Sequence, residues 1–141
     1  IKRTMGSGIK GTKSEPIIGT SDGALEHILD LLGPVEPEAK RMFGGLGIFR
    51  RGLMFALMDD NTLYMKVYDL NRADYEAKGS GPFVVVMRGK ETSIGYREIP
   101  SNVVEDPDRL IKWANKAIDV ALRADAAKPV SKRKIKPPAS R

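Results

Sequence analysis

The residues of this sequence that could do chemistry are few, and their spacing indicates neither a catalytic nor a metal-binding site. His27 is the single histidine and the chain has no cysteine, so ligands for a transition metal and a thiolate nucleophile are both lacking. Carboxylates cluster only at 59–60 and 105–108, where turn and helix-cap roles explain them. The serines in turn-like or edge positions have no histidine nearby in sequence to act as a base: Ser80, Ser93 and Ser101. We therefore expect no catalytic residue, no metal and no cofactor, and hence a protein that is not an enzyme.

Two glycine motifs resemble phosphate-binding loops, but neither has the required context. Residues 6–11 read G-x-G-x-x-G, a pattern that binds dinucleotides only between a strand and a helix N-terminus. Neither element is predicted there. Gly89-Lys90 with Thr92 lacks the earlier glycine of a phosphate loop, because Val84 stands in its place. A hairpin turn is the better interpretation of the second motif.

The most informative stretch runs from Arg41 to Phe49, with three glycines among large apolar residues. Glycine inside a strand usually marks a bulge or the close approach of another group. In one interpretation the glycines let the strand curl over the last helix, and Trp113 fills the space. In the other they leave the backbone open to a partner. The candidate partner-binding residues are Arg41, Phe43, Gly44, Gly45 and Gly47.

The net charge of +6 is concentrated at the two ends of the chain. Residues 1–20 carry +3 and residues 127–141 carry +6, which leaves −3 for residues 21–126. Cations without acids can neutralise phosphates in a salt-sensitive, sequence-blind manner, although such a tail can also merely solubilise. The candidate nucleic-acid contacts are Lys128, Lys132, Arg133, Lys134, Lys136 and Arg141.

Composition divides the chain into a flexible N-terminal arm (1–20), a folded domain (21–126) and a disordered basic tail (127–141). The arm has no periodicity, and part of it resembles residues that a cloning vector adds. No apolar run approaches the roughly 20 residues that span a bilayer, and no secretory signal is apparent. We therefore expect a cytoplasmic protein without a membrane partner.

Periodicity within 21–126 predicts an α+β domain of two layers. Asp106-Pro107 is a strong helix start, and the apolar stripe that follows continues to Leu122. Alternation at Leu63, Met65 and Val67 is typical of a half-buried strand. The predicted order is α-β-β-β-α-β-β-α, with three helices on a mostly antiparallel five-stranded sheet. The strands are predicted at 41–50, 53–58, 63–67, 83–88 and 92–99.

Several ordered segments of the sequence resemble the N-terminal domain of the TfoX/Sxy family. The resemblance begins with Arg41-Met42-Phe43-Gly44-Gly45 and covers about residues 23–123. Further matching segments are Gly47-Ile48, Gly52-x-Met54-Phe55-Ala56, Leu63-Tyr64-Met65-Lys66-Val67, Ala73-Asp74-Tyr75, Gly79, Pro82-Phe83, Tyr96, Pro100 and Trp113-Ala114 with Ala117. The resemblance implies an α+β domain of the secretion-chaperone-like type. Family members regulate competence for DNA uptake in bacteria and are thought to act with the cyclic-AMP receptor protein. Their second, helical domain is absent here, and the family supplies no established catalytic or binding residues to transfer.

The sequence therefore predicts a non-enzymatic, protein-binding regulatory module. We expect it to dock through a sheet edge or an exposed strand face, while its basic tail stays near nucleic acid. One alternative is a small-molecule sensor or minor enzyme with a pocket between sheet and helices, lined by Tyr64, Lys66 and Tyr96. Another is a homodimer that buries the apolar strand 53–58. The strand methionines suit either a core or an adaptable contact surface: Met42, Met54, Met58, Met65 and Met87.

Overall fold

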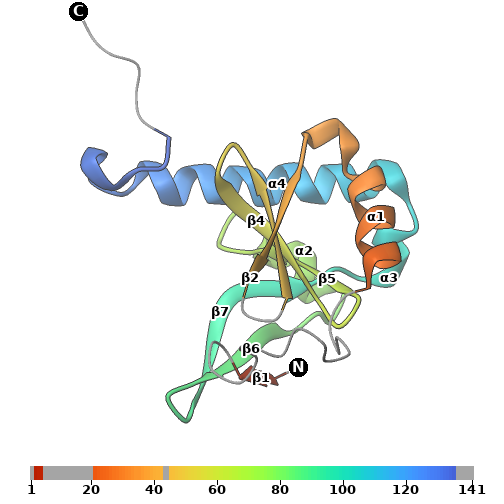
Figure 1. Ribbon diagram of the computed structural model, residues 1–141, viewed down its shortest axis with the longest axis horizontal. Coiled ribbons are helices and arrows are strands. Elements are labelled where there is room, and N and C mark those ends of the chain that lie inside the picture. Colours follow the sequence, from red (N-terminus) through yellow and green to blue (C-terminus); the bar gives the residue numbers. More distant parts are fainter. Residues whose placement is uncertain (1, 5–20, 43–44, 136–141) are drawn as a thin grey trace, which may run out of the picture.

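The fold consists of one curved sheet with its helices on one face (Figure 1). The computed structural model describes residues 2–4, 21–42 and 45–135. The elements in chain order are β1 (Lys2–Thr4), α1 (Asp22–Leu31), the 3-10 turn η1 (Gly33–Val35), β2 (Glu38–Met42), β3 (Gly45–Arg50), β4 (Leu53–Asp59), β5 (Thr62–Lys66), α2 (Arg72–Ala77), β6 (Pro82–Met87), β7 (Lys90–Glu98), α3 (Ser101–Val104), α4 (Pro107–Ala126) and the 3-10 turn η2 (Val130–Lys132).

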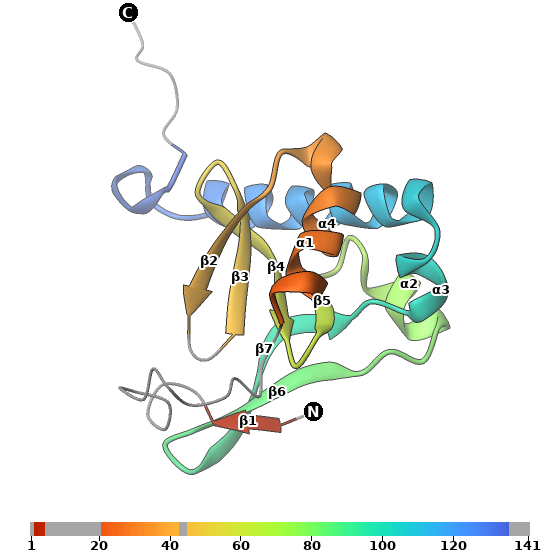
Figure 2. The same ribbon diagram turned by 45° about the vertical axis from the view of Figure 1, so that its right-hand side comes forward.

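The strands lie in the order β1-β6-β7-β5-β4-β3-β2. All neighbouring strands pair antiparallel except β1, which runs parallel to β6. β7 joins the two halves of the sheet, because its last residues pair with β5 while it pairs with β6 along its length. Figures 1 and 2 show the β6–β7 hairpin bent away from α4. The two-layer α+β class predicted from the sequence is confirmed.

Three tight hairpin turns set the register of the sheet. Each has two residues, both with positive φ, which is the type I′ conformation that matches the twist of antiparallel strands. Asn, Asp and Gly tolerate this backbone best, and they occupy four of the six positions. The turns are Arg51-Gly52 (φ 52° and 82°), Asp60-Asn61 (54° and 61°) and Arg88-Gly89 (52° and 79°). The hairpin predicted at Gly89 is therefore confirmed.

A β-bulge bends β4 where it passes β3. Ile48 lies opposite Ala56, but the next residue, Phe49, lies opposite Met54. One extra β4 residue, Phe55, is thereby accommodated, and both Phe55 and Ala56 reach the helix-side core. Met54 remains on the opposite face.

The main core lies between α4 and the sheet. Small residues at Ala114, Ala117 and Ala121 let the helix approach β4 and β5 closely, and all three are buried. Asp106 caps α4 as predicted, because its carboxylate accepts the Arg109 backbone N–H at 3.2 Å. Trp113 does not fill space beside the glycine strand, as one interpretation proposed. It is half-buried and packs edge-on against Tyr75, with ring centroids 4.6 Å apart.

Two features of the element order were predicted wrongly. The single strand expected at 41–50 is two strands, β2 and β3, which pair with Met42 opposite Gly45. The described part of the chain also contains β1 and α3, so the five expected strands are seven. β1 lies within the segment predicted to be a flexible arm, and residues 5–20 of that segment lie outside the described residues.

A buried asparagine joins β5 to α2 and gives a direct test of the fold. The Asn71 carboxamide accepts the Tyr68 N–H at 2.9 Å and donates to the Lys66 carbonyl at 3.0 Å. Asn71→Ala leaves both backbone groups without these partners, so we expect the free energy of unfolding to fall by about 2 kcal/mol. Urea denaturation measures it, with exposed Asn102→Ala as control. An unchanged urea midpoint for Asn71→Ala would show that these two hydrogen bonds do not stabilise the fold.

Candidate partner-binding face

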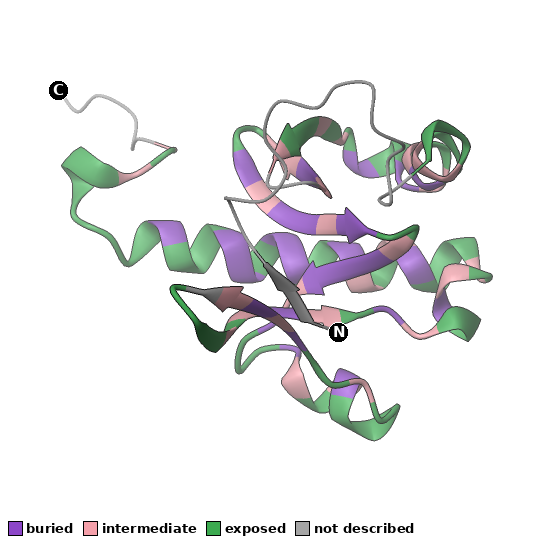
Figure 3. Ribbon diagram, turned by 60° about the horizontal axis from the view of Figure 1, so that its bottom comes forward, coloured by how far each residue is buried: buried purple, intermediate pink, exposed green. Residues whose placement is uncertain are grey.

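The face of the sheet opposite α4 carries its own apolar cluster. Its buried members are Tyr64, Phe83, Val85 and Tyr96, and the Tyr64 and Phe83 rings lie 4.5 Å apart. Half-buried Met54, Leu57 and Ile94 extend the cluster toward solvent. All described helices that contribute to a core pack on the other side of the sheet (Figure 3). We call this surface, with those seven residues, the helix-free face.

Gly45 and Gly47 allow neighbouring groups to pack closely on β3. A Cβ at Gly45 would lie 2.7 Å from the Met58 carbonyl oxygen, which is part of the backbone and cannot swing away. A Cβ at Gly47 would lie 2.6 Å from the Met42 sulfur and 2.9 Å from the Met54 sulfur. The thioethers therefore fold over the space where a side chain would be. A cavity of about 70 Å³ remains beside Met42, Gly45, Leu57, Phe83 and Ile94.

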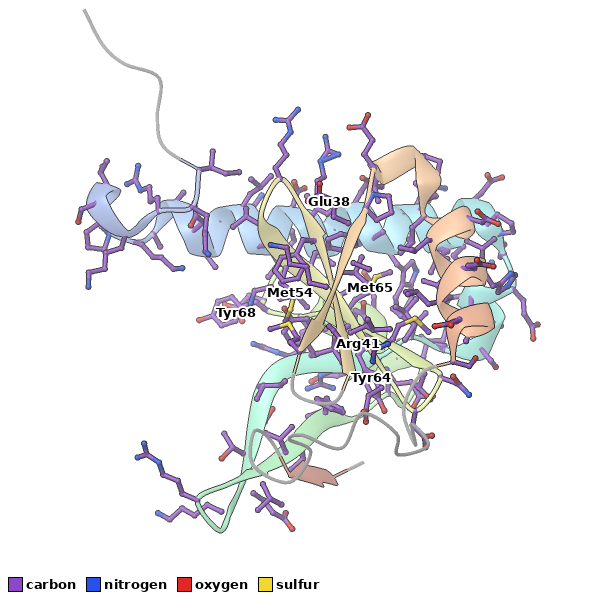
Figure 4. All side chains as sticks on the ribbon, in the orientation of Figure 1. Glu38, Arg41, Met54, Tyr64, Met65 and Tyr68 are labelled. Atoms are coloured by element: carbon purple, nitrogen blue, oxygen red, sulfur yellow. The ribbon has the colours of Figure 1, made fainter. Side chains whose placement is uncertain are left out.

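β2 is the edge strand next to these glycines. Among the described strands it pairs only with β3, so one of its sides is not taken up in the sheet. Its exposed residues Glu38, Lys40 and Arg41 are charged, which discourages indiscriminate pairing with other chains. Figure 4 shows Glu38 and Arg41 toward the two ends of the strand.

The three predicted partner-binding residues that the structure describes fall on two adjoining strands. Arg41 lies on β2, and Gly45 and Gly47 lie on β3. Phe43 and Gly44 lie outside the described residues. The structure explains Gly45 and Gly47 by close packing, and the groups that approach them are the Met58 carbonyl and the Met42 and Met54 sulfurs.

The methionines divide between the core and this face. Met58 and Met65 are buried in the main core, with 1% and 0% of their surface exposed. Met42 and Met54 are half-buried on the helix-free face and enclose Gly47. Met87 belongs to β6, but its side chain is not described. Two methionines are therefore positioned for an adaptable contact.

Tyr64, Lys66 and Tyr96 do not line a pocket between sheet and helices, as one alternative predicted. The two tyrosines belong to the helix-free cluster, and the Lys66 ammonium lies 5.2 Å from the Tyr96 ring centroid. Partial burial lowers the pKa of Lys66, and the like charge of Lys128 lowers it further. Burial raises the pKa of Tyr96, whose hydroxyl donates to the Met54 carbonyl at 3.4 Å. Tyr96 is therefore a neutral structural group at physiological pH.

A cavity does lie between sheet and helix, as that alternative predicted, but other residues line it. It measures about 330 Å³ and lies between the β3–β4 turn and α4. Arg50, Arg51 and Asp119 contribute charge to its wall, and Phe55, Leu122 and Ile135 contribute apolar surface.

Ile135 reaches that cavity because the segment after α4 folds back, which corrects the predicted disorder of residues 127–135. The Asp125 side chain is 3% exposed. Its two oxygens accept the backbone N–H groups of Lys134 at 2.7 Å and Ile135 at 3.0 Å. Lys128, Lys132, Arg133 and Lys134 are therefore held in place, while Lys136 and Arg141 lie outside the described residues.

The polar groups considered for catalysis have structural surroundings. His27 is exposed on α1, and the Ser80 hydroxyl donates to the Glu98 carbonyl at 2.6 Å. Within residues 2–4, 21–42 and 45–135, no three His, Cys, Asp or Glu side chains converge as a metal site would need. None of the described helices has the length and apolar character needed to cross a bilayer.

Comparison with known families matches residues 27–121 to the TfoX N-terminal domain. The match runs from within α1 into the last turns of α4, so it includes β2, β3 and the whole helix-free face and stops before the folded tail. A search of curated proteins finds no match.

The close approach at Gly45 predicts a specific steric cost. Gly45→Ala forces the β3 and β4 backbones apart, so we expect a loss of about 1–3 kcal/mol in the free energy of unfolding. Gly23→Ala in α1 is the matched control, because a Cβ there meets nothing within 4 Å. The control should stabilise the chain slightly through helix propensity. Equal melting temperatures for both variants would contradict the close packing of β3 on β4.

The Asp125 contact predicts a pH-dependent tail. Hydrogen bonds from the Ile135 and Lys134 N–H groups lower the pKa of Asp125. A carboxylate with a lowered pKa stabilises the folded tail above the ordinary aspartate pKa, and this stabilisation disappears as pH falls through the lowered value. In NMR spectra, the Lys134 and Ile135 amide shifts should move together on acidification before the β4 amides change. Loss of all signals in a single step would refute a separately released tail.

Proposed function

The chain belongs to the TfoX N-terminal domain family, and from this premise we propose that it is a competence-regulator-like module that acts by binding a protein partner. The proposal rests on the helix-free face, with its small cavity beside Gly45, and on the neighbouring edge strand β2. One side of β2 is unpaired among the described strands. The proposal assigns no catalytic step to the chain. Its place of action is the bacterial cytoplasm.

The mode of recognition is the addition of an extended partner segment along β2. An edge strand supplies backbone N–H and C=O groups for affinity, while pockets under alternate side chains supply specificity. Here the pocket is the small cavity beside Gly45, Leu57 and Ile94. Because Met42 and Met54 are flexible and polarisable, they can adapt to the inserted side chain.

The charge of β2 specifies the partner further. Lys40 and Arg41 outnumber Glu38 among its exposed residues, so the complementary segment carries acidic residues between its apolar ones. By family resemblance, a transcription regulator such as the cyclic-AMP receptor protein is the first partner to test. The basic tail keeps the resulting complex near nucleic acid through phosphate contacts.

A charge placed on the helix-free face tests the proposal. Met54 is half-buried there, so Met54→Glu should still fold but should put an unpaired carboxylate where an apolar partner side chain docks. We expect the partner to bind roughly tenfold or more weakly, as at interface hot spots. Isothermal titration with the cyclic-AMP receptor protein of the source organism measures the loss. Leu70→Glu is the control, because Leu70 is 39% exposed and belongs to neither apolar core.

Two outcomes would contradict this docking mode. The first is equal partner affinity for Met54→Glu and the unaltered chain, with melting temperatures matched. The second is that the face binds a second copy of this chain, which sedimentation velocity would show as a concentration-dependent dimer that Met54→Glu dissociates. β4 itself offers no free edge for such a dimer, because it pairs with β3 and β5.

A further inference from the structure

The end of α4 and the segment that follows it form a compact structure with many cations. Lys128, Lys132 and Lys134 are exposed, and Arg133 is half-buried. The Arg133 Nε donates to the Lys128 carbonyl at 2.9 Å, which closes the turn η2. Together with the two N–H groups held by Asp125, this contact positions the four cations relative to the helix. The tail is therefore an ordered part of the domain through Ile135.

Further cations approach this structure from the sheet. Arg50 and Arg51 of the β3–β4 turn line the same cavity as Ile135, and Lys66 is close enough to Lys128 for the two charges to interact. The nearby acids offset them only in part. Asp125 also forms an ion pair with Lys128, at 3.9 Å, and Asp119 is the one carboxylate in the described wall of the cavity. Figure 1 shows the segment after α4 turning back over the end of that helix.

We propose that Arg50, Arg51, Lys128, Lys132, Arg133 and Lys134 form a preformed site for the phosphate backbone of a nucleic acid. We call this set the C-terminal cationic surface. The proposal deepens the nucleic-acid part of the proposed function and rests on it, but it is independent of docking at β2. It differs from a flexible basic tail in one respect: the fold, through Asp125, arranges the charges before binding.

The composition of the surface favours a sequence-blind polyanion over a membrane. The described tail has no aromatic side chain on which a base could stack, so recognition is by phosphate charge. A membrane-binding surface needs apolar side chains to insert beside its cations. The exposed large apolar side chains here are two, Val130 (50% exposed) and Leu122 (40%), and Leu122 also lines the cavity.

The prearranged charges change what a mutation at Asp125 should do. Asp125→Ala removes a negative charge, so a purely electrostatic tail would bind nucleic acid equally well or better. In a preformed site the same change releases the tail, and the cations must be ordered again during binding, so affinity falls. A flexible tail and a preformed site therefore predict opposite changes in nucleic-acid affinity for Asp125→Ala. Asp119→Ala is the matched control, because it removes the same charge from the same helix without touching the tail contact.

The turn arginines allow a second matched pair. Arg51 and Arg88 occupy the first position of equivalent type I′ turns, each with φ of 52° and an exposed side chain. The β3–β4 turn lies beside α4, whereas the β6–β7 turn lies at the far end of the molecule (Figure 2). Arg51→Gln and Arg88→Gln thus each remove one cation. Because both positions have the same φ, the two substitutions have the same effect on the backbone of the turn. Only the first lies within the proposed site.

The experiment is fluorescence anisotropy of a labelled 20-base-pair DNA duplex of arbitrary sequence, titrated with the full chain between 50 and 200 mM salt. For the unaltered chain we expect log K to fall with log salt with a slope of roughly −4 to −5, from four to six neutralised phosphates. Asp125→Ala should weaken binding about fivefold while Asp119→Ala strengthens it slightly. Arg51→Gln should weaken binding about threefold and Arg88→Gln should not. Circular dichroism verifies that each variant is folded.

Three results would overturn the proposal. Asp125→Ala binding as tightly as Asp119→Ala would show that the tail acts without prearrangement. Equal effects of Arg51→Gln and Arg88→Gln would remove the turn from the site. Binding to phosphatidylserine vesicles without binding to the duplex would assign the surface to a membrane. The Met54→Glu titration is independent of all three, so the failure of either proposal leaves the other standing.

Discussion

The helix-free face depends on the contact between the β3 backbone and the β4 backbone at Gly45. The Met58 carbonyl lies where a side chain of any other residue at position 45 would begin, at 2.7 Å from the ideal Cβ position. A protein interior does not relax easily around such a contact, because its packing is close to that of organic crystals. Gly45 borders a small cavity on the helix-free face, beside the β2 edge, whereas Met42 and Met54 cover Gly47. The candidate function follows from that combination.

The two faces of the sheet have separate tasks. The face toward α4 holds the larger core, including Phe55, Ala56 and the alanines of α4, and it accounts for most of the buried apolar surface. The opposite face has a smaller cluster around Tyr64 and Phe83. Because stability comes chiefly from the first face, the second can carry the half-buried methionines on which the proposed recognition depends. The folded tail is a third region, outside the residues matched to the family.

Much of the fold could be predicted from the sequence where local chemistry determines structure. Asp106-Pro107 specifies the start of α4 because a side-chain acceptor and a fixed proline φ both suit a first helical turn. The turns at Arg51-Gly52 and Asp60-Asn61 were also predictable, because glycine, aspartate and asparagine tolerate positive φ. β2 ends at Met42 and β3 begins at Gly45, but the large apolar residues between Met42 and Phe49 predict one continuous strand, so the division was missed.

The candidate site was predictable only in part. Gly45 and Gly47 could be identified because unexplained glycines in an apolar strand indicate close packing. The folded tail could not be predicted, because Asp125 accepts backbone N–H groups nine and ten residues later. Every residue except proline has a backbone N–H, so the sequence does not indicate which ones a carboxylate binds. Composition alone predicts disorder for a lysine-rich, proline-containing segment. One buried carboxylate reverses that expectation through residue 135.

Hydrogen–deuterium exchange of the β2 amides tests the central claim most directly. The chain would be compared alone and bound to its protein partner, residue by residue across 38–42. Strand addition predicts that amides on the open side of β2 exchange quickly in the free chain and become protected in the complex, together with those around Gly47. Protection confined to α4 or the tail, with β2 unchanged, would contradict the account.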